Sequence, residues 1–169
     1  MKKYLFLMLI FFAGCNSDLY TKKLASNNLK GNSPKVIIDN LFELQYAENR
    51  AIAFGLLRNI PDATRHAVII VLSGIIISVL TCVIWKNRKD GLLKLLPLFI
   101  ILAGAMGNLL DRIYHGYVID FIHLHYKEKL SWPVFNVADI LICVGVGLLL
   151  FQAFISEGSV SQAKAEEPE

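Results

Sequence analysis

Two aspartates, Asp120 and Asp139, lie in or beside strongly apolar segments of the chain. Asp120 is enclosed in the run VIDFI, and Asp139 ends the run FNVAD, which opens an apolar stretch that continues to about Phe154. A carboxylate at membrane depth is unfavourable by several kcal/mol, so it persists only with a partner or a use. Two carboxyl groups close together share one proton, so that one acts as base and the other as acid. The pair therefore predicts activation of a water molecule for hydrolysis.

Three polar residues near these aspartates have the spacing needed to support them. Asn108 and Arg112 are four residues apart at the end of an apolar segment, so they share a helix face. Asn136 precedes Asp139 by three residues, which again places both on one face. Amide and guanidinium groups donate hydrogen bonds, so these residues could orient the two carboxyl groups or a substrate backbone.

Simpler explanations exist for some of the acidic residues. Asp111 is adjacent to Arg112 and is expected to form a local ion pair with it. Asp139 follows a helix start at Pro133 and would also interact favourably with a helix N-terminus. Asp18 and Lys22 have the i,i+4 spacing of an ordinary helical ion pair. These alternatives remain open at the level of sequence.

Neither the histidines nor the cysteines predict a metal site. His123 and His125 form a His-x-His pattern of the kind that strands carry, and His115 lies nearby, but no carboxylate or cysteine completes the set at a suitable spacing. The three cysteines are far apart and form no C-x-x-C pair, which argues against a disulfide framework or a zinc site. We expect no metal and no cofactor.

The composition indicates an integral membrane protein. Of the 169 residues, 55% are hydrophobic and only 18% are charged, whereas soluble domains are about a quarter charged. The net charge of +3 is small and no basic stripe is interleaved with aromatics, so nucleic-acid binding is not expected. Four apolar segments, at about 4–24, 66–85, 92–112 and 134–154, are long enough to span a bilayer.

The remaining segments suggest one membrane domain over residues 1–155 with a disordered tail at 156–169. β-branched residues with partial alternation in Val36–Gln45 make short strands plausible, so residues of about 30–60 are expected to form an outer layer. Lysines and arginines at positions 2, 3, 86, 88 and 89 place both termini and the second connection in the cytoplasm. The aspartate pair then lies near the outer face.

The first apolar block has a second interpretation. Lys2 and Lys3 followed by an apolar run and by Ala13-Gly14-Cys15 resemble a lipoprotein signal peptide that is lipidated at Cys15. The bulky Phe12 is unusual for such a signal, and we favour a first helix that is retained.

Four motifs together resemble the bacterial lipoprotein signal peptidases, also called signal peptidase II. The runs GAMGNLLDRIYHGYVIDFI and FNVADILICVG are similar to that family's two aspartate motifs. NRAIAFG is similar to its N-x-G-A-A-F-G segment, and Asp18 with Lys22 matches its D-x-x-x-K pattern. The motifs occur in family order between about residues 16 and 150.

The resemblance implies an all-α membrane protein of four transmembrane helices with a small β-rich periplasmic layer. It implies a monomeric inner-membrane aspartyl endopeptidase that cleaves diacylglyceryl-modified prolipoproteins before the lipidated cysteine and binds globomycin-type inhibitors. The catalytic pair falls on Asp120 and Asp139. The positions matching substrate and inhibitor contacts are Asp18, Asn49, Asn108, Arg112, Asn136 and Ala138.

One departure and one competing function accompany this resemblance. Arg50-Ala51-Ile52 replaces the usual Thr-Gly-Ala, so the outer loop is expected to differ in how it binds lipid or peptide. Intramembrane carboxylates are also typical of proton relays, so a small proton or solute transporter is the alternative. Only four spans and no sign of inverted repeats argue against it.

Overall fold

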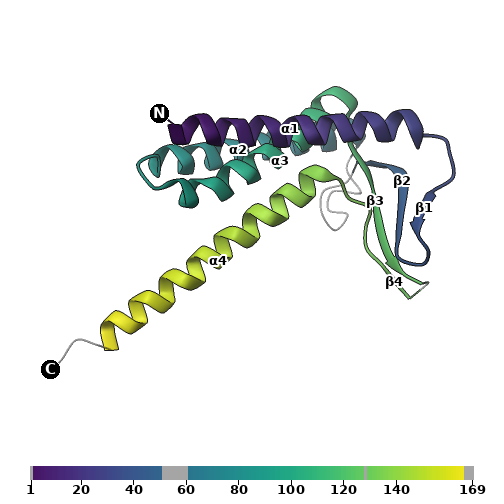
Figure 1. Cartoon of the computed structure of the whole chain (residues 1–169). Coiled ribbons are helices and arrows are strands. Elements are labelled where there is room, and N and C mark those ends of the chain that lie inside the picture. The colour runs from purple at the N-terminus through teal and green to yellow at the C-terminus, as the bar shows by residue number, and fades with distance from the viewer. Residues whose placement is uncertain (1, 51–60, 128, 166–169) are drawn as a thin grey trace.

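The computed structural model describes residues 2–50, 61–127 and 129–165, which form four long helices and a small sheet (Figure 1). The helices are α1 (Lys2–Asn28), α2 (Asp62–Lys86), α3 (Leu92–His115) and α4 (Val137–Ala165). The strands are β1 (Lys35–Ile38), β2 (Phe42–Asn49), β3 (Val118–Tyr126) and β4 (Leu130–Ser131). The expected fold class, a helical membrane protein with a small β layer, is confirmed.

Each helix contains a stretch long and apolar enough to cross a membrane. The chain is therefore a multi-pass membrane protein. α4 starts three residues later than the expected span because Phe135 pairs with Ile122 of β3 and keeps the chain extended up to that point. At its other end α4 continues to Ala165, where a disordered tail from residue 156 was expected. Residues 162–165, with the sequence QAKA, are good helix formers and can prolong an existing helix.

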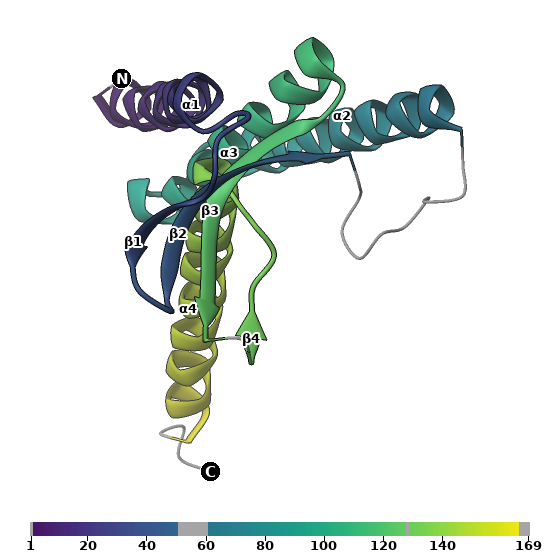
Figure 2. The same cartoon turned by 90° about the vertical axis from the view of Figure 1, so that its right-hand side faces the viewer.

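The four strands form an antiparallel sheet in the order β1-β2-β3-β4, which lies at one end of the helices (Figure 2). Strands within Val36–Gln45 were expected and are present as β1 and β2. The segment around Asp120 was expected only as a short apolar segment at the membrane edge, but it forms the nine-residue strand β3. Its pairing with β2 places Glu43 opposite His123 and Ala47 opposite Asp120. The part of the expected outer layer at 51–60 lies outside the described residues.

Two apolar clusters hold these elements together. One joins α1 to α3 through the buried side chains of Leu7, Leu95, Leu98 and Phe99. The other packs Ala25 and Leu29, at the end of α1, against Phe121 of β3. Since Phe121 adjoins Asp120, burial of this apolar side chain determines where the carboxyl group of Asp120 is presented.

Small residues allow α3 to approach α1 and α4 closely, as the spacing of Gly104 and Gly107 suggests. A Cβ atom at Gly104 would collide with the carbonyl oxygen of Ala138, and one at Gly107 would collide with the carboxylate of Asp18. Gly145 of α4 meets the backbone of α3 in the same way, whereas Gly147 has nothing within 4 Å. The close approach of backbones thus falls on the same helical turns that carry the polar residues.

A proline inside α3 creates a further link to α4. Pro97 has no N–H, so the carbonyl of Leu93, four residues earlier, loses its usual helical partner. Gln152 of α4 donates its side-chain amide to this carbonyl at 2.8 Å.

Candidate active site

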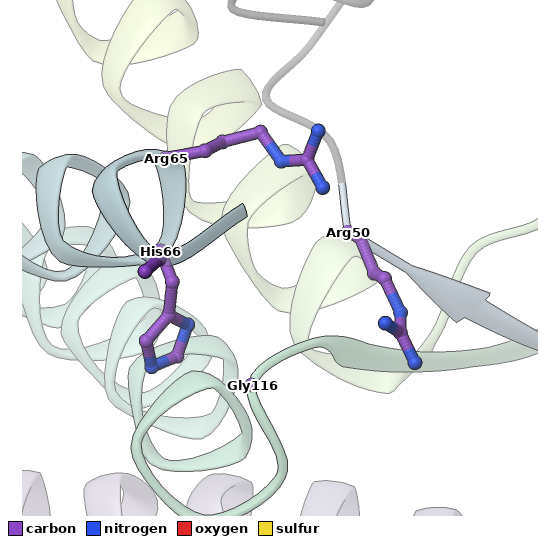
Figure 3. Close-up of a pocket in the computed structure, with 5 residues that line it drawn as sticks. Arg50, Arg65, His66 and Gly116 are labelled. Carbon is purple, nitrogen blue, oxygen red and sulfur yellow. The ribbon is translucent and has the colours of Figure 1, made fainter. Parts of the chain in front are cut away.

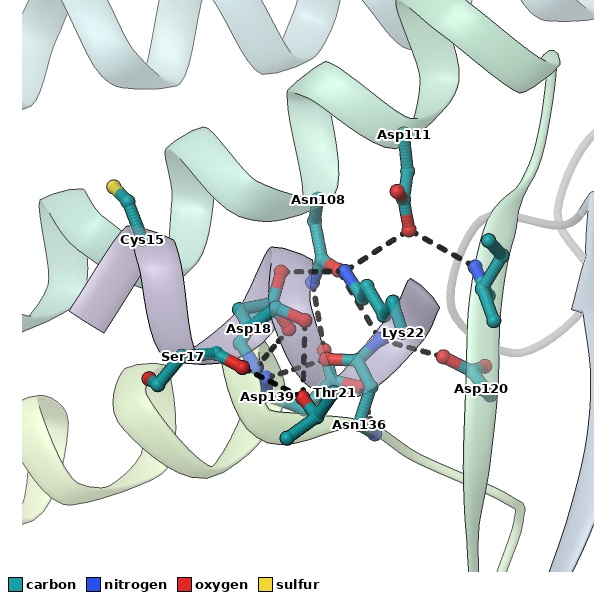
Figure 4. Close-up of polar contacts among 12 residues, drawn as sticks. Cys15, Ser17, Asp18, Thr21, Lys22, Asn108, Asp111, Asp120, Asn136 and Asp139 are labelled. Carbon is teal, nitrogen blue, oxygen red and sulfur yellow. Dashed lines mark hydrogen bonds and ion pairs between the residues drawn. The ribbon is translucent and has the colours of Figure 1, made fainter. Parts of the chain in front are cut away.

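Asp120 is buried on β3 between the side-chain amides of Asn49 and Asn136, and Figure 4 shows its position beside Asn136. Asn136 donates its side-chain N–H to Oδ1 at 2.6 Å, and Asn49 of β2 donates to Oδ2 at 2.9 Å. Burial raises the pKa of Asp120 to about 6, and the negative charge of Asp139 acts in the same direction. The donated hydrogen bonds from Asn49 and Asn136 oppose this rise, since they stabilise the ionised form. Asp120 can therefore hold a proton under mildly acidic conditions, where an ordinary aspartate is ionised.

Asp139 lies in the first turn of α4 and is held by α3 and by its own backbone. Asn108 of α3 donates its side-chain amide to Oδ1 at 2.8 Å, and the backbone N–H of Asn136 donates to Oδ2 at 3.2 Å. The backbone N–H of Asp139 donates in return to the side-chain oxygen of Asn136 at 3.0 Å. This reciprocal arrangement satisfies N–H groups that a helix start would otherwise leave unpaired.

Asn136 connects the two aspartates. It is fully buried, and its side-chain N–H donates to Asp120. Its side-chain oxygen accepts from the backbone N–H of Asp139, and its own backbone N–H donates to the Asp139 carboxylate. Its side-chain amide nitrogen also lies 3.2 Å from the side-chain oxygen of Asn108. The structure therefore brings together Asp120, Asp139, Asn49, Asn108 and Asn136, five of the eight residues predicted for the site.

Beside the aspartates lies a buried ion-pair cluster, centred on Lys22 (Figure 4). Its ammonium lies 2.7 Å from Asp18 Oδ2 and 3.0 Å from Asp111 Oδ2, and donates to the side-chain oxygen of Asn108 at 3.0 Å. The expected local pairing of Asp111 with Arg112 is wrong, because the carboxyl group of Asp111 points into the bundle toward Lys22. Two carboxylates with one ammonium leave this cluster with a net negative charge if all three are ionised.

The cluster joins α1 and α3 to β3 and α4, the strand and helix that carry the two aspartates. Asp111 Oδ2 accepts a hydrogen bond from the backbone N–H of Ile119 on β3 at 3.0 Å. Asp18 Oδ1 accepts one from the backbone N–H of Ala138 on α4 at 2.8 Å. Asp18 and Ala138 are both fully buried, so in this structure they position the start of α4, whereas Asp111 positions β3. Lys22 was recognised from the sequence only as the partner of Asp18.

Arg112, the remaining predicted residue, lies one turn beyond Asn108 on α3. Its guanidinium donates to the carbonyl oxygen of Asn108 at 3.0 Å, and its charge interacts with those of Asp139 and Asp120. It is partly exposed, unlike Lys22. A cation at this place can attract a polarised carbonyl group.

One hollow adjoins the site, and a second lies beside Arg50, next to Asn49 in the chain. One, of about 280 Å³, has Asp139 at its edge and is otherwise lined mainly by apolar side chains, namely Leu124, Trp132, Phe135, Ile140, Cys143 and Val144. The other, of about 270 Å³, is lined by residues at the end of β2, the start of α2 and the turn after α3 (Figure 3). Arg50, which departs from the family pattern, lines this second hollow. Its guanidinium pairs with Glu48 at 3.0 Å and stacks over Tyr117 at 5.3 Å, whereas its neighbour Asn49 contacts Asp120.

The contact between Glu43 and His123 was not predicted, because the two residues are 80 positions apart in the chain. Glu43 of β2 lies opposite His123, and a carboxylate oxygen of Glu43 is 2.7 Å from His123 Nδ1. The expectation that no carboxylate accompanies the histidines is therefore wrong, since strand pairing supplies one.

Comparison with known proteins agrees with this geometry. A family model described as signal peptidase (SPase) II matches residues 10–155. The chain belongs to the signal peptidase II family. A lipoprotein signal peptidase of Clostridium acetobutylicum is 38% identical over 148 residues, which are 88% of this chain and 92% of the relative. One of Pelodictyon phaeoclathratiforme is 41% identical over 143 residues, covering 79% of this chain and 80% of the relative.

Solved structures give the same fold. A bacterial membrane enzyme determined at 2.3 Å resolution superposes with a TM-score of 0.78 at 24% identity, over 96% of this chain and 94% of its own. A second bacterial membrane enzyme, at 1.9 Å resolution, has a TM-score of 0.73 at 26% identity, over 87% of this chain and 91% of its own. Family membership makes the chain a peptidase that acts in lipoprotein processing, and it gives the transporter alternative no support.

Proposed function

We propose that this member of the signal peptidase II family is an aspartic endopeptidase whose catalytic pair is Asp120 and Asp139. The observation that carries the proposal is the convergence of both carboxyl groups on Asn136, within a largely buried polar cluster. Asp139 also lies at the edge of a mainly apolar hollow, where part of a substrate could bind beside the pair.

In the proposed reaction the two carboxyl groups hold one proton between them. The ionised group takes a proton from water, which attacks the carbonyl carbon of the scissile peptide bond, while the protonated group gives its proton to the carbonyl oxygen. The first group then gives its new proton to the amide nitrogen as the C–N bond of the tetrahedral intermediate breaks. The second group takes a proton from a hydroxyl of the intermediate, so the pair returns to its singly protonated state. Asn108 and Asn136 orient the pair through the hydrogen bonds described above. The half-buried charge of Arg112 is placed to stabilise negative charge that develops on the carbonyl oxygen.

The proposed substrate is a diacylglyceryl-modified prolipoprotein, cleaved before its lipidated cysteine. The apolar hollow beside Asp139 supports this choice, because it can take an apolar side chain or part of an acyl chain. We place the enzyme in the bacterial inner membrane as a monomer, with the aspartate pair near the periplasmic face. Asp18, Asn49, Asn108, Arg112, Asn136 and Ala138 remain the proposed positions for contacts with substrate or with globomycin-type inhibitors.

The test of this function is cleavage of a purified precursor with and without the diacylglyceryl group. We expect the modified precursor to be cut before its cysteine and the unmodified one to be cut at least about tenfold more slowly, which corresponds to about 1.4 kcal/mol of lost binding. Mass spectrometry of both products locates the cleaved bond. Equal rates for the two precursors, or a cut elsewhere, would remove the proposed specificity.

The same assay gives a prediction for pH. Because burial and the nearby charge of Asp139 raise the pKa of Asp120 to about 6, the pair loses its shared proton as the pH rises through that value. We expect kcat/KM to fall on the alkaline side of this pH. In Asn49→Ala the ionised form of Asp120 loses a donated hydrogen bond, so its pKa rises and the alkaline limb should move to higher pH. A limb that stays in place or moves to lower pH would contradict this assignment of the proton.

A further inference from the structure

Three groups with metal-binding atoms meet on the paired strands β2 and β3, at a distance from the aspartate pair. A carboxylate oxygen of Glu43, a ring nitrogen of His123 and a ring nitrogen of His125 all lie within 4.8 Å of one another. His123 and His125 are two residues apart on β3, so they project from the same face of the sheet. Glu43 is directly opposite His123 in the register, which adds the carboxylate to that face.

The hydrogen bonds around the two histidines orient one ring nitrogen of each toward Glu43. His125 Nδ1 lies 3.3 Å from the carbonyl oxygen of Lys127, which can only accept, so this nitrogen carries the proton. In the neutral ring Nε2 then presents its lone pair, and this atom is 3.9 Å from Glu43 Oε2. A lone pair that faces a carboxylate is favourable only when a proton or a metal ion lies between them.

His123 is held in the corresponding way. Its Nε2 lies 2.9 Å from the hydroxyl oxygen of Ser131 on β4, and its Nδ1 faces Glu43. Partners of this kind on the second ring nitrogen fix the orientation of histidines that bind metals. The two rings are stacked, with their centroids 5.2 Å apart, so both can turn toward one ion.

We propose that Glu43, His123 and His125 bind a divalent transition-metal ion of the zinc type. Two imidazoles and one carboxylate form a ligand set that zinc accepts, and the three side chains leave a fourth position for water. All three are 15–20% exposed, so an ion can reach them from solvent. At zinc bonds of about 2.0–2.2 Å, ligand atoms in a tetrahedron lie roughly 3.4 Å apart. The ligand atoms here lie within 4.8 Å of one another, so the more distant ones would move together, whereas His123 Nδ1 and Glu43 Oε1, now 2.7 Å apart, would separate. The bound ion would cross-link β2 to β3 in the half of the sheet that ends in the β1–β2 turn.

The site is separate from the proposed catalytic pair. His123 follows Asp120 by three residues on β3, about 10 Å along the strand, and by strand alternation it projects from the opposite face. Metal binding and peptidase activity can therefore be measured independently, and failure of one does not decide the other.

Calorimetric titration of the full-length protein with Zn²⁺, after removal of metal by a chelator, tests the proposal. We expect one zinc per chain in the wild type. Glu43→Gln, His123→Ala and His125→Ala should each weaken binding by more than about 100-fold, because loss of even an outer-shell partner weakens metal sites by about 10–100-fold. His115→Ala, a histidine stacked on Tyr117 outside the cluster, is the matched control and should keep wild-type affinity.

A second measurement keeps the result clear if a variant folds poorly. Zn²⁺ should raise the midpoint of thermal unfolding of the wild type and of His115→Ala, but not that of Glu43→Gln, since binding to the folded state alone stabilises it. Co²⁺ should give the visible absorption of a site with nitrogen ligands in the same two proteins. Absence of zinc binding by the wild type, or loss of binding in Asp120→Asn with retention in His125→Ala, would overturn the proposal.

Discussion

We expect Asp120→Asn and Asp139→Asn each to lower kcat for cleavage of the lipid-modified precursor by about 100- to 10,000-fold, the usual contribution of a positioned acid or base. Asparagine preserves the size of each side chain, but its single oxygen can keep only one of the two hydrogen bonds that each aspartate accepts. It can neither take a proton from water nor share one with the other carboxyl group. The loss should therefore appear in kcat, with KM changed little, because the hollow beside Asp139 is retained.

The effect must be separated from loss of protein. Asp39→Asn, which changes an exposed aspartate in the turn between β1 and β2, is a control with the same chemical change and should keep wild-type kcat. All three variants should accumulate in membranes to similar levels. Cleavage within a few-fold of wild type by either Asp120→Asn or Asp139→Asn would show that the pair does not perform the reaction.

The second large effect is expected at Lys22, which is 1% exposed. In Lys22→Met the carboxylates of Asp18 and Asp111 would remain buried without their cation. Removing one partner of a buried ion pair typically destabilises a protein by about 3–5 kcal/mol. For a chain of this size we expect the midpoint of thermal unfolding in detergent to fall by about 10 °C.

Further substitutions separate the ion-pair explanation from lost packing. Adding Asp18→Asn and Asp111→Asn to Lys22→Met removes the uncompensated charges while keeping acceptors for the backbone N–H groups of Ala138 and Ile119. This triple variant should recover part of the lost stability. Lys30→Met, at the exposed pair with Glu48, should change the unfolding midpoint little. A triple variant no more stable than Lys22→Met alone would argue against the charge explanation.

Asp120 and Asp139 were easier to recognise from the sequence than the buried ion-pair cluster of Asp18, Lys22 and Asp111 that lies beside them. Asp120 and Asp139 stand out in sequence because each interrupts or opens an apolar run. Asp111 does not, because it is adjacent to Arg112, and adjacency suggested a local pair. In the helix the two side chains leave in different directions, so Asp111 reaches Lys22, 89 positions away in the chain.

In the sheet, too, the sequence predicted individual strands but not their pairing. The alternation in Val36–Gln45 was sufficient to predict strands, but nothing local indicates which segment pairs with them. Register depends on the burial of Phe121 against α1 and on the bulge in β2 between Leu44 and Ala47. These long-range conditions bring Asn49 to Asp120 and Glu43 to His123.

The amino-acid sequence alone determined the four apolar spans, the strands within Val36–Gln45 and the two aspartates, because hydrophobic runs, alternation and charges within them are local properties. The tertiary structure alone decided that Asn136 joins the aspartates, that Lys22 bridges two buried carboxyl groups and that Glu43 faces a histidine pair. Those contacts join residues on different elements, and their geometry follows from close approach at Gly104 and Gly107 and from strand register. Neither the close approach of the helices nor the register of the strands can be read from the spacing of residues along the chain.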